Sequence, residues 1–184
     1  GTGDHVNVPY SATLDSFSNF SVEAWVMIDS ATGGNYAVCK YIAPYPTNYD
    51  WLLMVNNAAP GFYIAKISDG GNSSYGTDSS ETMSVGQWYH LVGTYVSGGA
   101  MRIYVNGVDR GSTNNPEGMR NLNIAVRFGI GSVESFTGLI DEVAIWNVAL
   151  TPAQITARYN GGAGAELVGN EAGLVSVWHM NDPK

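Results

Sequence analysis

Aromatic and amide side chains gather in one stretch of the sequence, residues 41–51, which reads YIAPYPTNYDW. Flat rings can stack on the C–H groups of a sugar, and amide and carboxylate groups can bind its hydroxyls. Two prolines and an asparagine place much of the stretch in a loop, which favours exposure of Tyr45. Tyr49 and Trp51 alternate along the strand that should follow. We predict a ligand-binding surface formed by Tyr45, Asn48, Tyr49, Asp50 and Trp51.

Two parts of this prediction are open on sequence alone. Tyr49 and Trp51 could instead belong to the core of the strand. Tyr75 follows Asn72 and two serines, and such turn-forming neighbours favour a second exposed loop aromatic. The oxygen-rich residues 68–78 around it are interpreted as a solvated turn.

The common catalytic motifs are missing from the sequence. It contains no Gly-x-Ser-x-Gly elbow, no His-Glu-x-x-His helix and no glycine-rich phosphate loop before a helix. The three histidines are scattered and there is one cysteine, so a zinc site is not expected. Glu23 is the only acid on its expected strand, and the consecutive Asp141 and Glu142 should point to opposite faces. We therefore predict no catalytic site.

Short runs of strand-forming residues, separated by turn signals, must position these side chains. In residues 20–28 the apolar side chains at alternate positions share a core face, whereas Glu23, Trp25 and Met27 share the other. Trp25 could therefore be structural or exposed. The other expected strands are residues 5–8, 37–41, 50–55, 61–67, 88–96, 101–105, 108–111, 124–130, 139–146 and 174–179.

Two local motifs are more specific. Asn106 and Gly107 separate two alternating runs and predict a type I′ hairpin. Residues 151–154 read TPAQ, which offers an N-cap threonine, a proline at the first helical position and a glutamine that completes a capping box. Ile155 and Tyr159 lie one turn apart and should dock this helix on the strands.

Composition limits the class of partner. The chain has 184 residues, and we expect a single domain over residues 1–184 with its own core. Sixteen acidic and eight basic residues give a net charge of −8 without a basic cluster, which argues against nucleic acid and anionic membranes as partners. No apolar stretch approaches the roughly 18 residues of a membrane span, and residues 1–4 do not resemble a signal peptide. Cys39 lies in an apolar run, where a buried, inert thiol is expected.

Four segments of the chain, taken in order, resemble the laminin G-like jelly-roll modules of the concanavalin A-like lectin and glucanase superfamily. The resemblance spans nearly the whole chain, and the order and spacing of the segments make it specific. The segments are residues 4–9 (DHVNVP), 20–26 (FSVEAWV), 87–95 (QWYHLVGTY) leading into the hairpin YVNG, and 136–146 (FTGLIDEVAIW) leading into the helix. Residues 169–180 look like the closing strand of the family.

The resemblance implies an all-β fold in which two antiparallel, curved sheets stack as a jelly-roll sandwich, with one short C-terminal helix. It also implies that Trp88, Trp146 and Trp178 are core residues. The superfamily includes lectins, adhesion modules and glycan-cleaving enzymes, so the fold does not choose a function. Its glucanases place two glutamates and an aspartate at alternate positions of one strand, and no strand here does so.

We therefore predict a noncatalytic, lectin-like module that binds a polysaccharide or other glycan, in an extracellular or cell-surface protein. One alternative is a protein-adhesion or structural module that contacts other surface proteins. A second alternative is a polysaccharide-degrading enzyme with an unusual site.

The resemblance also implies a structural Ca²⁺ ion between the loop before the first strand and the last long strand. Asp141 matches the aspartate of that strand, and Gly3 and Asp4 lie in the first loop. Calcium prefers several carboxylate and carbonyl oxygens as ligands. Asp141 could instead accept backbone hydrogen bonds.

Overall fold

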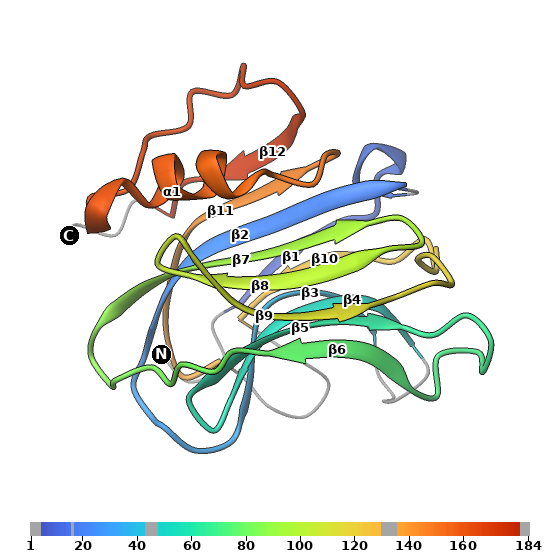
Figure 1. Cartoon of the computed structure of the whole chain (residues 1–184), viewed down its shortest axis with the longest axis horizontal. Helices are drawn as coiled ribbons and strands as arrows, with labels where there is room; N and C mark the ends of the chain where they lie inside the picture. Colours follow the sequence, from blue (N-terminus) through green and yellow to red (C-terminus); the bar gives the residue numbers. More distant parts are fainter. Residues whose placement is uncertain (1–4, 16, 43–47, 130–135, 181–184) are drawn as a thin grey trace.

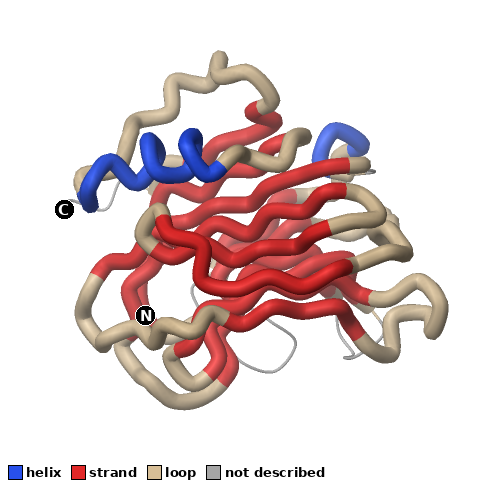
Figure 2. Tube along the Cα trace, in the orientation of Figure 1, coloured by secondary structure: helices blue, strands red, loops and turns tan. Residues whose placement is uncertain are grey.

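A computed structural model describes residues 5–15, 17–42, 48–129 and 136–180 of the chain. Within these residues two antiparallel sheets stack face to face, and one α-helix lies on the outside of one sheet (Figures 1 and 2). The fold confirms the all-β, two-sheet sandwich with a short C-terminal helix. No helix in the described part of the chain is long and apolar enough to span a membrane.

The first sheet contains a strand that the sequence interpretation missed. Residues 74–78 form β6 and not a solvated turn, because they pair with β5 along their whole length. The sequence signal is weak since Tyr75 is the only large apolar residue of β6. In sheet order the strands are β1 (Val6–Val8), β10 (Val126–Phe128), β3 (Gly34–Tyr41), β4 (Tyr49–Asn56), β5 (Ala59–Ala65) and β6 (Ser74–Asp78).

The second sheet contains the predicted hairpin. Asn106 and Gly107 have φ angles of 52° and 80°, and the positive sign at both positions is what a type I′ turn requires. In sheet order the strands are β12 (Leu174–Trp178), β11 (Gly138–Trp146), β2 (Asn19–Ile28), β7 (Trp88–Val96), β8 (Ala100–Val105) and β9 (Val108–Asn114).

The main core lies between the two sheets. The alternation predicted for β2 is confirmed, since Phe20, Val22, Ala24, Val26 and Ile28 are all fully buried. The ring of Phe20 packs against aromatic rings of the first sheet, with centroids 5.6 Å from Trp51 and 5.7 Å from Phe62. Cys39 is also fully buried, and burial raises the pKa of its thiol to about 12, in keeping with the predicted inert side chain.

A second, smaller core lies outside the second sheet, under helix α1 (Pro152–Tyr159). The predicted capping box between Thr151 and Gln154 is present, and Ile155 is the buried residue of the helix. Short 3₁₀ turns occur at η1 (Ala12–Leu14) and, directly after α1, at η2 (Asn160–Gly162). Ile155 joins a buried cluster with Val92, Tyr104, Ala144, Trp146, Leu150 and Leu167. The helix and the chain that leaves it therefore cover part of the outer face of this sheet (Figure 1).

Candidate functional site

The uncovered part of this outer face carries aromatic and acidic side chains on three neighbouring strands. The register pairs Trp25 of β2 with Asp141 of β11 on one side and with His90 of β7 on the other. Trp88, two residues before His90, pairs with Met27. The residues that alternate with them fill the main core, so these side chains project outward.

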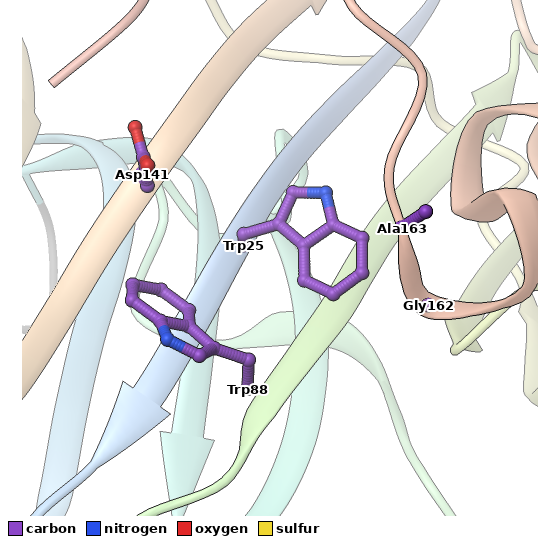
Figure 3. A pocket seen from close by; sticks show the side chains of 5 residues that line it. All are labelled: Trp25, Trp88, Asp141, Gly162 and Ala163. Atoms are coloured by element: carbon purple, nitrogen blue, oxygen red, sulfur yellow. The ribbon is translucent and has the colours of Figure 1, made fainter. Parts of the chain in front are cut away.

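Two indole rings line a cavity of about 370 Å³ on this face. Its lining residues are Trp25, Trp88, Asp141, Gly162 and Ala163 (Figure 3). Gly162 and Ala163 belong to the chain that leaves α1, so the wall of the cavity comes from a segment distant in sequence from β2 and β7. Both indoles are partly exposed.

A second cavity of about 420 Å³ adjoins the first, because Trp25 and Ala163 line both. We call the two cavities together the indole groove. The remaining residues that line the second cavity are Glu142, Gly164, Ala165, Glu166 and His179.

A β-bulge in β11 turns two consecutive acids toward the indole groove. The register with β2 shifts between Asp141 and Ala144, and Glu142 has a φ of 50°. Asp141 lines the first cavity and Glu142 lines the second. The expectation that these side chains point to opposite faces is therefore wrong, because the extra residue of a bulge interrupts strand alternation.

The two acids are held differently. Asp141 is 3% exposed, and its Oδ1 accepts hydrogen bonds from the backbone N–H groups of Glu142, at 2.8 Å, and Met180, at 3.0 Å. The Oε2 of Glu142 lies 2.7 Å from Nδ1 of His179, which follows β12. Asp141 thus has a rigid position, and Glu142 belongs to a more exposed pair.

Packing orients the indole of Trp25. Its ring centroid lies 6.0 Å from that of Tyr159 on α1, in a stacked arrangement, and 5.3 Å from that of His90. A side chain added at Gly164 would lie 3.5 Å from the indole, so the chain after α1 also passes in contact with the ring. A ring held on several sides loses little conformational entropy when a ligand binds.

A buried charge network lies beneath α1 and holds these elements together. Glu23 is 1% exposed and accepts hydrogen bonds from Nε of Arg158 at 2.9 Å and from Nε1 of Trp146 at 3.3 Å. Its other oxygen lies 2.9 Å from Nε2 of His90. The network joins β2, β7 and β11 to α1, and so it fixes the wall of the indole groove relative to Trp25.

The structure places most of the predicted ligand-binding residues of the 41–51 stretch in the interior. Trp51 is fully buried in the main core, and Tyr49 is 1% exposed in a cluster with Tyr41. Asp50 is 1% exposed, and its Oδ2 lies 2.9 Å from Nζ of Lys40. These three side chains are not at a surface that a glycan can reach, because strand β4 already begins at Tyr49 and its first five residues are all buried.

The other predicted ligand-binding residues are Asn48, Tyr75 and Tyr45. Asn48 is partly exposed, and its carbonyl accepts a hydrogen bond from the backbone N–H of Ile42 at 2.8 Å. Tyr75 lies on β6 and packs partly against the main core, while its hydroxyl donates to Glu117 at 2.8 Å. Tyr45 lies outside the described residues.

Asp141 is the one predicted calcium ligand within the described residues, since Gly3 and Asp4 lie outside them. It accepts two backbone hydrogen bonds, as the alternative interpretation proposed. No cluster of three or more His, Cys, Asp or Glu side chains that could hold a metal ion occurs among the residues the structure describes. The calcium site therefore stays a prediction that depends on the first residues of the chain.

Sequence reasoning missed Trp88 and left Trp25 undecided. Trp88 was expected in the core from the family resemblance, but it is partly exposed and lines the indole groove. Trp146, by contrast, is 3% exposed, as the resemblance implied. The sequence did contain a signal for Trp25. The apolar side chains of β2 share the face that packs in the main core, so Trp25, on the opposite face of the strand, points away from the space between the sheets.

The fold and the sequence together identify the family. The chain belongs to the concanavalin A-like lectin/glucanases superfamily, whose laminin G-like family model matches residues 1–156. This match confirms the resemblance drawn from the four segments. No curated protein matches the chain significantly.

Solved structures share the fold at low sequence identity. A proposed carbohydrate-binding protein from Bacteroides ovatus has a TM-score of 0.72 and 20% identity, over 97% of this chain and 50% of that one. Domain 4 of an extracellular arabinanase from Geobacillus stearothermophilus, solved with arabinotriose, has a TM-score of 0.63 and 25% identity, over 83% of this chain and 71% of that one. The ligand-binding domain of botulinum neurotoxin serotype D, solved with N-acetylneuraminic acid, has a TM-score of 0.68 and 19% identity, over 87% of this chain and 40% of that one. This chain thus spans about half or less of the first and third of these proteins.

Proposed function

We propose that this chain is a carbohydrate-binding module and that the indole groove holds the glycan. The observation that carries the proposal is the pair of partly exposed indoles, Trp25 and Trp88, in one cavity with Asp141. Indole faces stack on sugar C–H groups, and the carboxylate can accept hydrogen bonds from sugar hydroxyls. The similar arabinanase domain was solved with arabinotriose and the similar toxin domain with N-acetylneuraminic acid, and these sugar complexes support the proposal.

Binding without cleavage fits the groove better than catalysis. Glycoside hydrolysis needs one carboxylic acid to deliver a proton and a second carboxylate to attack or to activate water. Here Asp141 accepts two backbone hydrogen bonds and Glu142 pairs with His179, so both acids already have structural partners. Incubation with a panel of polysaccharides should release no reducing ends, and release that disappears in Asp141→Asn would identify an enzyme instead.

The main test removes each indole in turn. Trp25→Ala and Trp88→Ala should each lower affinity for a bound glycan by about tenfold or more, as expected for a ring at the centre of a binding site. Tyr10→Ala is the matched control, since Tyr10 is 46% exposed and does not line the groove. A glycan array selects the ligand, and calorimetry then measures each variant after thermal unfolding has verified its fold.

Three results would redirect the proposal. Wild-type affinity in both tryptophan variants would place the ligand elsewhere, and loss of binding in Tyr45→Ala would then favour the predicted loop surface. An array without any bound glycan would favour the protein-adhesion module.

We also propose that the module belongs to an extracellular or surface protein, a setting supported by the extracellular arabinanase whose domain it resembles.

We also propose a structural calcium ion at Asp141, with further ligands from Gly3 and Asp4. An ion that binds only the folded state raises its stability. Addition of a chelator should therefore lower the melting temperature, and Asp141→Asn should abolish this response. A melting temperature that does not change with chelator would contradict the site.

A further inference from the structure

A further cavity lies on the outer face of the second sheet, at the other end of helix α1. It has a volume of about 470 Å³, and none of the described residues that line it also lines the indole groove. Strands β7, β8 and β9 contribute to its lining, and residues 149–152, which lead into α1, form a wall. The wall of the indole groove follows α1 instead, so the two sites lie at opposite ends of the helix. We call this further cavity the Arg102 cavity.

The polar side chains of the Arg102 cavity come from neighbouring strands in register. Thr94 of β7 pairs with Arg102 of β8, and Tyr104 of β8 pairs with Asp109 of β9. Ile103, which lies between Arg102 and Tyr104, belongs to the main core. Because side chains alternate along a strand, its two neighbours point outward. The outer face of the sheet thus brings a cation, an acid and two hydroxyl groups into one cavity.

Tyr104 is a buried side chain whose hydroxyl has no protein partner in the described part of the chain. The residue is 2% exposed, and its ring packs in the smaller core with Val92 and Leu150. No hydrogen bond to its hydroxyl occurs among the described residues, whereas the charges of Asp109 and Arg102 act on it. Burial raises the pKa of this hydroxyl, so it stays a neutral donor at neutral pH. A ligand that supplies the missing partner would be favoured, since a buried polar group without one is costly.

The ion pair between Arg102 and Asp109 supplies donors and an acceptor side by side. Their side chains are 42% and 37% exposed, and they are the only charged residues among the described residues that line the cavity. A guanidinium has several N–H donors and a carboxylate several acceptor positions, so each keeps hydrogen-bonding capacity for a ligand. The only aromatic ring among these lining residues is that of Tyr104, which is buried. Binding here would therefore depend on hydrogen bonds and not on stacking.

We propose that the Arg102 cavity is a second saccharide site, which binds neutral sugars through adjacent hydroxyl groups. One hydroxyl accepts a hydrogen bond from Arg102, its neighbour donates to Asp109, and the Tyr104 hydroxyl donates to a third oxygen. A neutral ligand suits a neutral ion pair, because an anionic sugar would be attracted by Arg102 and repelled by Asp109. The inference takes only the class of ligand from the proposed function and goes beyond it, since this site does not include the indole groove.

The test is a nuclear magnetic resonance titration of the isotope-labelled protein with neutral trisaccharides, namely maltotriose, cellotriose, xylotriose and mannotriose, and with any glycan that the array selects. The indole N–H signals of Trp25 and Trp88 report on the indole groove, and the backbone amides of Arg102, Tyr104 and Asp109 report on the Arg102 cavity. One or more of these sugars should shift the amides of the cavity. The shifts should persist in Trp25→Ala, because Trp25 does not line this cavity. A galacturonic acid trimer should bind no more tightly than the neutral sugars.

Two variants test the polar groups. Tyr104→Phe removes a hydroxyl that makes no hydrogen bond among the described residues, so the fold should be kept and affinity at this cavity should fall about threefold to tenfold. Tyr10→Phe is the matched control, since Tyr10 is 46% exposed and does not line the cavity. Asp109→Asn should lower affinity for the neutral sugar about tenfold, because it removes a charged acceptor. Asp29→Asn, an exposed acid directly after β2, is its control.

Asp109→Asn also has a distinctive effect that a loss of structure would not produce. The variant leaves the positive charge of Arg102 without its partner, so the galacturonic acid trimer should bind more tightly than it does to the wild type. In both variants the indole signals should respond to a glycan as in the wild type, which separates the two sites.

The outcomes distinguish this inference from the proposed function. Sugars that shift the indole signals but never the amides of the Arg102 cavity would overturn the second site and leave the groove in place. Shifts at the cavity that are unaffected by Tyr104→Phe and Asp109→Asn would overturn the assigned contacts, and tighter binding of the galacturonic acid trimer to the wild type would overturn the neutral ligand class. If no sugar of the panel or of the array shifts either set of signals, the proposed function fails as well.

Discussion

Two regions of this molecule place a tryptophan beside an aspartate, and only one of them leaves its tryptophan partly exposed. In β4, Trp51 is fully buried and Asp50 is 1% exposed. In the indole groove, Trp25 is partly exposed, and Asp141 is buried but lines a cavity. Similar residue types therefore produce a core in one sheet and a candidate binding site in the other.

Asp50 and Asp141 differ in the groups that contact their carboxylates. Lys40 forms ion pairs with both Asp15 and Asp50 inside the protein, and all three side chains are at most 2% exposed. Burial, partly offset by the Lys40 charge, raises the pKa of the Asp50 carboxyl. Asp141 accepts two backbone N–H hydrogen bonds on one oxygen, and the residue lines the cavity. A buried acid with an internal counter-ion is structural, whereas an acid that lines a cavity beside partly exposed rings can contact a ligand.

The largest effect should follow when the internal counter-ion is removed. Lys40→Ala leaves Asp15 and Asp50 buried without their cation, and we expect a loss of about 3–5 kcal/mol in the free energy of unfolding. Chemical denaturation measures it. Arg102→Ala breaks the exposed pair with Asp109 and should cost no more than about 1 kcal/mol. Similar losses in the two variants would show that the buried cluster does not need its lysine.

A smaller effect should follow when the charge beneath α1 is removed. Glu23→Gln weakens the hydrogen bonds from Arg158 and Trp146, and we expect a loss of about 2–3 kcal/mol in the free energy of unfolding. Glycan affinity should fall too, because α1 leads into the groove wall at Gly162. Gln154→Ala is the control, since it removes half of the capping box and should cost about 1 kcal/mol without loss of affinity. Unchanged affinity in Glu23→Gln would show that the network does not position the wall.

The smallest effect concerns the side chain that holds Tyr75. Glu117 accepts hydrogen bonds from the hydroxyls of Ser68 and Tyr75 and from the backbone N–H groups of Ile67 and Ser68, and these bonds lower the pKa of its carboxyl from 4.5 to about 2. A lowered pKa in the folded state stabilises the contacts above about pH 4.5, and this contribution is lost as the pH falls toward 2.

Amide exchange measures this loss locally. The Ile67 and Ser68 amides should lose protection between about pH 4.5 and 2, and in Glu117→Gln they should be less protected at neutral pH and lack the acid transition. Asp109→Asn is the comparison variant, since Asp109 pairs with Arg102 and not with these amides. Protection that stays constant across this pH range in the wild type would contradict the role of Glu117.

Much of the fold could be predicted from the sequence because local patterns encode it. The alternation of β2, the turn at Asn106 and Gly107 and the capping box of α1 are all short-range signals, and each is present in the structure. Strand β6 was not predicted, because its residues lack an alternating apolar pattern and it is recognised as a strand only by its pairing with β5. The candidate site escaped for a related reason, since a sequence does not show which aromatic residues remain uncovered.

The sequence by itself determined the family, the one helix of the described chain and its strands other than β6, because apolar periodicity and turn residues act over a few positions. Only the tertiary structure decided which side chains could meet a ligand. A bulge in β11 brings Asp141 and Glu142 to one face, and the chain after α1 supplies the wall opposite Trp25. Exposure depends on packing between segments that are more than a hundred residues apart in the chain, such as Trp25 and Ala163.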